Sequence, residues 1–177
     1  YNPAGRLPIT YYTSLEELPA FEDYDMRDRT YKYYKGAPLF PFGYGLSYTR
    51  FSYSDLKTAS SLKAGEPLTV KFTLTNSGKR AGDEVVQLYL SDLKASTPRP
   101  QHQLVAFDRV HLQPNEQREL EIQIDPRAFS LINSEGKRVI EPGAFELHIG
   151  GGQPQFIDSD QRIQKRISVK GRHSLAL

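Results

Sequence analysis

The chain has 177 residues, of which 38% are hydrophobic and 25% charged, with a formal net charge of +2 and no cysteine. This composition is typical of a globular protein large enough to bury a core. No apolar run approaches the ~20 residues that span a bilayer, and basic residues alternate with acidic ones, so we expect neither a membrane nor a nucleic acid as partner. Without cysteine, disulfides, thiolate metal sites and cysteine catalysis are excluded.

The start of the chain predicts a strand and then a brief helical turn. In "RLPITYY" the residues Leu7, Ile9 and Tyr11 share one face, and in "SLEEL" the residues Ser14 and Glu17 have the spacing of a capping box. The chain begins with Tyr1 and has neither an initiator methionine nor a signal peptide. We therefore expect it to be a piece of a longer or processed polypeptide.

A connector rich in aromatic residues is expected up to about residue 50. From residue 30 to residue 45 neither a period of 2 nor one of 3.6 holds, and glycine and proline recur. Exposed rings could form a platform for sugars, but closely spaced proline and glycine turn successive rings in different directions, which favours packing between domains. The predicted packing residues are Phe40, Phe42, Gly43, Tyr44, Gly45, Tyr48 and Phe51.

Seven short runs after residue 50 predict strands. The clearest is "LTVKFTLT", in which Leu68, Val70, Phe72 and Leu74 alternate with polar residues. In "LVAFDRVHL" the alternation slips near Asp108, which predicts a β-bulge. The seven runs predict an antiparallel β-sandwich, with a small barrel as the alternative: "FSYSDL", "LTVKFTLT", "EVVQLYLS", "LVAFDRVHL", "ELEIQID", "AFELHIG" and "RIQKRISV".

No self-sufficient active site is predicted. The carboxylates Glu22, Asp23, Asp25 and Asp28 could be imagined as the acid and nucleophile of a glycosidase, but their spacing singles out no pair. Histidines at positions 102, 111, 148 and 173 fall on different predicted strands, a loop and a tail, so no metal site is expected. The glycines at 150–152 are expected to form a loop between strands, and no cofactor is predicted.

Four phrases resemble, in family order, the carboxy-terminal region of glycoside hydrolase family 3, the β-glucosidases and β-xylosidases: "NPAGRLPITYY", "FEDYDMRDRTYKYYKGAPLFPFGYGLSYTRFSY", "LTNSGKRAGDEVVQLYL" and "EPGAFELHIGG". The resemblance covers nearly the whole chain. It implies that residues 1 to about 12 end the family's α/β sandwich domain, that residues up to 50 form a wrapping linker, and that residues 51–177 form a fibronectin type III-like domain.

The resemblance also implies that both catalytic residues of the family lie upstream of Tyr1, so none is assigned to this chain. It implies a non-catalytic structural module of a periplasmic or extracellular enzyme, whose partners are the catalytic barrel and the α/β sandwich domain of the same polypeptide. Self-association through the orphaned first strand is a further expectation.

Two other functions stay open. The first alternative is an independent carbohydrate-binding module, which would need a row of exposed aromatic residues; the strands instead place mostly Thr, Lys, Glu, Gln and Arg outward. The second is enzyme activity of the fragment itself. Xyloside against glucoside specificity also stays open, because the family's subsite residues lie elsewhere.

Overall fold

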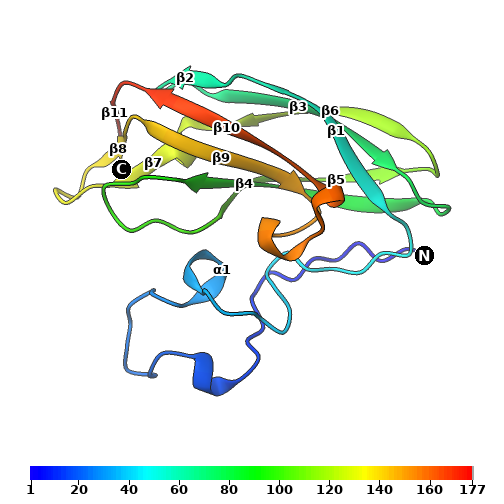
Figure 1. The fold of residues 1–177 in the computed structure, drawn as a ribbon, viewed down its shortest axis with the longest axis horizontal. Coiled ribbons are helices and arrows are strands. Elements are labelled where there is room, and N and C mark those ends of the chain that lie inside the picture. Colours follow the sequence, from blue (N-terminus) through cyan, green and yellow to red (C-terminus); the bar gives the residue numbers. More distant parts are fainter. Residues whose placement is uncertain (177) are drawn as a thin grey trace.

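The computed structural model describes residues 1–176, and it consists of a β-sandwich with an irregular lobe below it (Figure 1). Residues 1–50 form the lobe, and β1 begins at Phe51. The lobe contains the 3₁₀ turn η1 (Leu15–Glu17) and one turn of helix, α1 (Thr30–Tyr33). No helix of the described residues is long and apolar enough to cross a membrane.

Two main sheets make the sandwich. One has the order β1-β3-β6, with β1 (Phe51–Thr58), β3 (Leu68–Asn76) and β6 (Gln117–Ile124). The other has the order β2-β10-β9-β4-β5, and its strands are β2 (Ser61–Lys63), β10 (Arg162–Lys170), β9 (Gly143–Gly150), β4 (Gly82–Asp92) and β5 (Gln103–Leu112).

A third small sheet has the order β11-β8-β7 and closes one end of the sandwich. Its strands are β7 (Ser130–Ile132), β8 (Arg138–Ile140) and β11 (His173–Leu175). The 3₁₀ turns η2 (Pro126–Phe129), η3 (Pro154–Phe156) and η4 (Ser159–Gln161) lie in the connections.

The predicted all-β sandwich is confirmed, because each of the seven sequence runs lies on a strand of the two main sheets. The strands β2, β7, β8 and β11 were missed, since each has only three residues and shows no periodicity. One pair, β10 with β2, is parallel, so the sandwich is not purely antiparallel.

The core lies where the alternating faces of the two sheets meet. On β3, Leu68, Val70, Phe72 and Leu74 are at most 2% exposed, as the alternation predicts. β4 and β9 supply the opposing face through Val86, Leu88, Leu90, Phe145, Leu147 and Ile149. Burial of this apolar surface is the main contribution to the stability of the sandwich.

The register prediction for β5 needs a small correction. The bulge lies at Val105, because Leu88 pairs with Ala106 and Tyr89 pairs with Leu104, whereas Asp108 pairs regularly with Val86. The break in the alternation thus reflects a real bulge, which lies three residues before the predicted position.

The strand predicted around Leu7, Ile9 and Tyr11 is wrong. This segment is extended, but it makes only an isolated bridge between Tyr11 and Phe40. Its backbone nonetheless finds partners in the connector: the Leu7 N–H donates to the Tyr44 carbonyl (2.9 Å), and the Gly43 N–H donates to the Leu7 carbonyl (2.8 Å). The connector therefore takes the place that a neighbouring strand would have.

The predicted helical turn exists, but its capping box does not form. Ser14 precedes η1 without a side-chain hydrogen bond to the backbone. The Glu17 carboxylate instead accepts a hydrogen bond from the Tyr34 hydroxyl (2.5 Å), and this contact raises the pKa of Tyr34 to about 12. The helical turn α1 was missed, because four residues are too few for a periodic signal.

Candidate functional site: a docking node between lobe and sandwich

The lobe contacts the sandwich through a buried polar cluster, which we call the docking node: Arg6, Tyr53, Gly43, Glu84, Gln87, Tyr89 and Gly151. Its members come from the first segment, the connector, β1, β4 and the β9–β10 connection. The node thus joins five segments that lie far apart in the sequence.

An ion pair forms the centre of the docking node. Arg6 Nη2 lies 2.9 Å from Glu84 Oε2, and the two side chains are 12% and 5% exposed. The Tyr53 hydroxyl donates to Glu84 Oε1 over 2.8 Å. Both carboxylate oxygens therefore have a partner, as a buried charge requires.

Burial sets the electrostatics of this centre. Burial raises the pKa of Glu84 above its ordinary value, while the Arg6 guanidinium and the Tyr53 hydroxyl act in the opposite direction. Burial also raises the pKa of Tyr53, and the neighbouring Glu84 adds to that effect. The charge of Glu84 in the folded chain consequently depends on Arg6.

A glutamine on β4 holds the connector and a glycine loop together. Gln87 Nε2 donates to the Gly43 carbonyl (3.1 Å) and to the Gly151 carbonyl (3.0 Å), and Gln87 Oε1 accepts from the Tyr89 hydroxyl (2.6 Å). Gln87 and Tyr89 are 3% and 0% exposed. β4 is thus buried on both faces, one against the core and one against the lobe.

Two glycines of the connector have steric reasons to be glycine. Gly43 has a φ of +78°, and a Cβ there would lie 2.3 Å from Gln87 Oε1. At Gly45 a Cβ would lie 2.2 Å from the Gly5 carbonyl oxygen. At both positions the backbone lies close to other groups of the chain.

The predicted aromatic packing residues behave in three ways. Phe51 is buried in the core, and Phe42 stacks on Tyr31 with ring centroids 4.1 Å apart. Tyr48 is 70% exposed, with the Arg80 guanidinium 5.8 Å from its ring centroid. Tyr44 and Phe40 are partly exposed and lie near each other, with centroids 5.3 Å apart.

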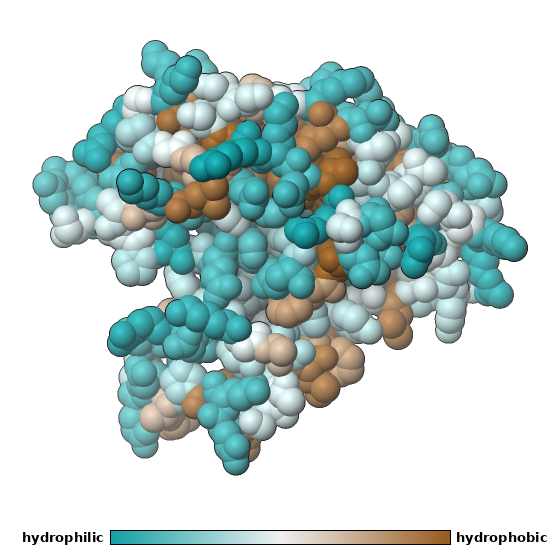
Figure 2. All heavy atoms as spheres, in the orientation of Figure 1, coloured by the Kyte–Doolittle hydropathy of each residue, from teal (hydrophilic) through white to brown (hydrophobic). Residues whose placement is uncertain are grey.

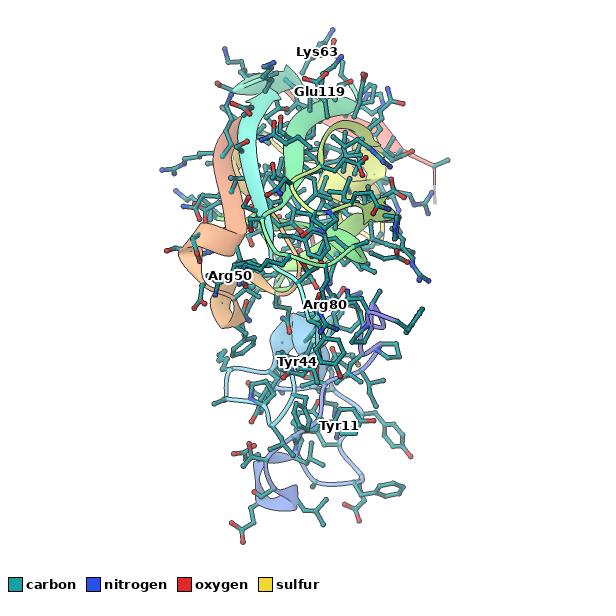
Figure 3. The ribbon with its side chains drawn as sticks, turned by 90° about the vertical axis from the view of Figure 1, so that its right-hand side faces the viewer. Tyr11, Tyr44, Arg50, Lys63, Arg80 and Glu119 are labelled. Carbon is teal, nitrogen blue, oxygen red and sulfur yellow. The ribbon has the colours of Figure 1, made fainter. Side chains whose placement is uncertain are left out.

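An apolar groove on the lobe is lined by Pro3, Leu7, Tyr11, Phe40, Tyr44 and Leu46. Tyr11 and Tyr44 are labelled on the lobe in Figure 3, and Figure 2 shows apolar side chains gathered on this part of the surface. Among the described residues, most of the large exposed apolar side chains belong to the first 50 residues, whereas the sandwich exposes only a few scattered ones. We call this groove the apolar face.

The remaining sequence candidates do not assemble into a catalytic site. Glu22, Asp23, Asp25 and Asp28 are exposed on the lobe, and Asp25 pairs with Arg27 at 2.7 Å. No group of three or more His, Asp or Glu within residues 1–176 converges to hold a metal ion.

Two histidines that the sequence separated lie together. The rings of His102 and His148 are 5.7 Å apart and edge to face, Ser91 Oγ lies 2.7 Å from His102 Nδ1, and Glu146 Oε2 lies 3.1 Å from His148 Nε2. Burial lowers the pKa of His102 to about 4 and also lowers the pKa of His148. Neutral imidazoles beneath a covered sheet face fit a packing role. No sequence pattern predicts this contact, because His102 lies in a loop and His148 lies on β9.

Comparison with known proteins finds similarity at two levels, a family model for part of the sandwich and relatives that match most of the chain. Residues 84–153 match the family model of the fibronectin type III-like domain. A periplasmic β-glucosidase of Salmonella typhimurium is 37% identical over 163 residues, which are 85% of this chain and 21% of that protein. A protein named as a β-xylosidase in Formosa agariphila is 32% identical over 93% of this chain and 22% of its own length.

A solved structure extends the similarity to three dimensions. β-glucosidase 3B of Thermotoga neapolitana, in complex with α-D-glucose, superimposes with a TM-score of 0.84 at 31% identity, over 98% of this chain and 26% of the other. The chain thus spans about a fifth to a quarter of the length of the proteins that it matches.

Proposed function

Because this chain belongs to the carboxy-terminal, fibronectin type III-like region of glycoside hydrolase family 3, we propose that it is the non-catalytic structural module of a β-glycosidase. In this proposal the parent protein removes terminal β-linked glucose or xylose from oligosaccharides by a retaining mechanism. The module stabilises the catalytic barrel and the α/β sandwich domain of the same polypeptide. A periplasmic or extracellular location is supported by the periplasmic β-glucosidase among its relatives.

The observation that carries the proposal is the apolar face. Leu46 is 65% exposed, and Tyr11 and Phe40 are 45% and 39% exposed, on a lobe that the docking node fixes to the sandwich. Contiguous exposed apolar side chains mark an interaction surface. The relatives are several times longer than this chain, so the rest of the polypeptide is the available partner for that surface.

The test compares a substitution on the apolar face in two contexts. Leu46→Ser should lower the stability of the full-length parent by roughly 1.5–3 kcal/mol, the value of burying one leucine, and should change that of the isolated 177-residue chain by less than about 0.5 kcal/mol. Denaturant unfolding of both proteins measures this. Leu93→Ser, at a leucine of the sandwich that is 46% exposed, is the matched control.

Activity gives a second readout. The parent should hydrolyse aryl β-glucosides or β-xylosides, and the purified 177-residue chain should not. Equal effects of Leu46→Ser and Leu93→Ser in the parent would contradict the proposed surface. Turnover by the isolated chain that disappears on substitution of Glu22 or Asp25 would contradict the non-catalytic role.

A further inference from the structure

A second pocket, distinct from the apolar face in its chemistry, lies between the connector and the β9–β10 connection. Its volume is about 420 Å³, within the range of roughly 300–1,000 Å³ that small-molecule sites occupy. Its lining includes Arg50, which Figure 3 labels where the lobe meets the sandwich, and Tyr44, labelled lower on the lobe. Asp158 and Phe156 line it from the turn region before β10. The Arg6–Glu84 ion pair also lines it.

The formal charges that line this pocket balance. Arg6 and Arg50 carry two positive charges, and Glu84 and Asp158 carry two negative ones. Arg6 is paired with Glu84, but neither Arg50 nor Asp158 belongs to any ion pair of residues 1–176. A lining of this kind favours a ligand without net charge over a phosphate, a uronate or an ammonium.

The pocket offers both donors and acceptors to such a ligand. The guanidinium of Arg50 can only donate, and the carboxylate of Asp158 can only accept. Two nitrogens of Arg6, Nε and Nη1, are buried and have no hydrogen-bond partner among the described residues, and the side chain of Gln153, 2% exposed, adds an amide to the lining. A polyol uses both kinds of group at once, because each hydroxyl both donates and accepts.

Two aromatic rings complete the pocket. Tyr44 of the connector and Phe156 of η3 are 37% and 40% exposed. A ring exposed to this degree presents an apolar surface to a ligand, and the C–H faces of a pyranose are apolar. We propose that this pocket binds the end of a neutral oligosaccharide.

Such a site would give the module a function beyond packing. A bound sugar would contact the connector through Tyr44 and the sandwich through Asp158 and Phe156, so occupancy would also stabilise the docking of the lobe. The choice of β-linked glucose and xylose as probes rests on the proposed function of the parent. The pocket is argued from its lining residues and does not depend on that function.

The experiment titrates the 177-residue chain with cellobiose, laminaribiose and xylobiose and follows backbone amides by ¹H–¹⁵N NMR. At least one of these sugars should shift the amides of Gly151 and Gly152, which line the pocket, while glucuronic acid and glucosamine should not at the same concentration. Asp158→Ala and Phe156→Ala should each weaken binding about tenfold, the typical loss for one charged hydrogen bond or one stacked ring.

The control substitution is Phe107→Ala, which removes a 69% exposed ring from β5, outside the pocket lining, and should leave binding unchanged. Circular dichroism checks that each variant is folded. The proposal is wrong if none of the three sugars shifts these amides, or if Asp158→Ala binds as tightly as the unaltered chain. It is also wrong if the amides shift only when the upstream domains of the parent are added, because the pocket is then a contact with polypeptide.

The sugar pocket and the apolar face adjoin, since Arg6, Tyr44, Gly45 and Leu46 line both. Asp158 and Phe156 line the sugar pocket alone, so the loss of sugar binding in their variants does not bear on the effect of Leu46→Ser on the parent.

Discussion

At the scale of single residues, Glu84 is the most demanding group of the chain. Its side chain is 5% exposed, it lies between Arg6 and Tyr53, and these partners come from positions 78 and 31 residues away. Breaking a buried ion pair by removing one partner costs far more than the pair contributes, because an uncompensated charge remains. Arg6 is therefore the residue whose loss should show whether the lobe and the sandwich form one cooperative unit.

We predict that Arg6→Met destabilises the chain by about 3–5 kcal/mol at pH 8. The deficit should be smaller at pH 4, because protonation of Glu84 then removes the unpaired charge. The pKa of Glu84 is already raised in the folded chain, and a raised carboxyl pKa means that stability is lost as the pH rises above the unfolded value of about 4.5. Removal of Arg6 should raise this pKa further and steepen the loss.

Urea denaturation at the two pH values measures the effect. The double variant Arg6→Met, Glu84→Gln is the control, since it removes both charges and should recover much of the stability at pH 8. A deficit of Arg6→Met that is equal at pH 4 and pH 8 would rule out an unpaired Glu84 carboxylate as its cause.

At the scale of elements, the sequence predicts features that depend on neighbouring residues alone. It misses burial that a distant segment of the chain produces when it covers a strand. The alternation of Leu68, Val70 and Phe72 identifies β3 and its buried face without reference to any other segment. On β4 the same rule assigns Gln87 and Tyr89 to an exposed face, yet both are buried, because the connector covers them.

The first segment shows the converse error. Leu7 and Tyr11 have the period of a strand, but a strand also needs a partner of matching register, which the pattern cannot reveal. The sequence predicts Gly43 and Gly45 as packing residues, and both lie at close contacts within the chain, while their packing between domains stays a prediction. The pairing of Arg6 with Glu84 carried no local signal.

A substitution at Gly43 tests how the connector docks on β4. Gly43→Val should destabilise the chain by roughly 1–3 kcal/mol, because valine is strained at a φ of +78° and its Cβ would meet the Gln87 amide. Thermal or urea unfolding measures it. Gly5→Val is the matched control, since a Cβ at Gly5 has no atom within 4 Å among its described neighbours, and an equal effect of the two would show that the close contact does not matter.

At the scale of the whole molecule, the lobe is attached to the sandwich at two ends but not in the middle. Residues 2–11 hold to the connector and to Glu84, and residues 30–43 cover β4, whereas residues 13–28 extend away as the lower tip of the molecule (Figure 1). Phe21 and Tyr24 at this tip are 90% and 89% exposed. The division into residues 1–50 and 51–177 therefore stays a proposal about packing in the parent, and we expect protease sensitivity to follow the contacts within the lobe.

We predict that chymotrypsin first cuts after Phe21 or Tyr24 and that the amino-terminal peptide stays bound. The Arg6–Glu84 ion pair and the backbone hydrogen bonds of Leu7 and Tyr11 with the connector hold it after the chain is cut. Mass spectrometry of the denatured digest identifies the cut, and size-exclusion chromatography of the undenatured digest shows whether the two pieces elute together.

In Arg6→Met the same cut should release the peptide, because the ion pair is its only buried charged contact with the sandwich among the described residues. A first cut between Leu68 and Leu90 would instead mean that the sandwich opens before the lobe does, and that the core assigned to β3 and β4 is not the most stable part of the chain.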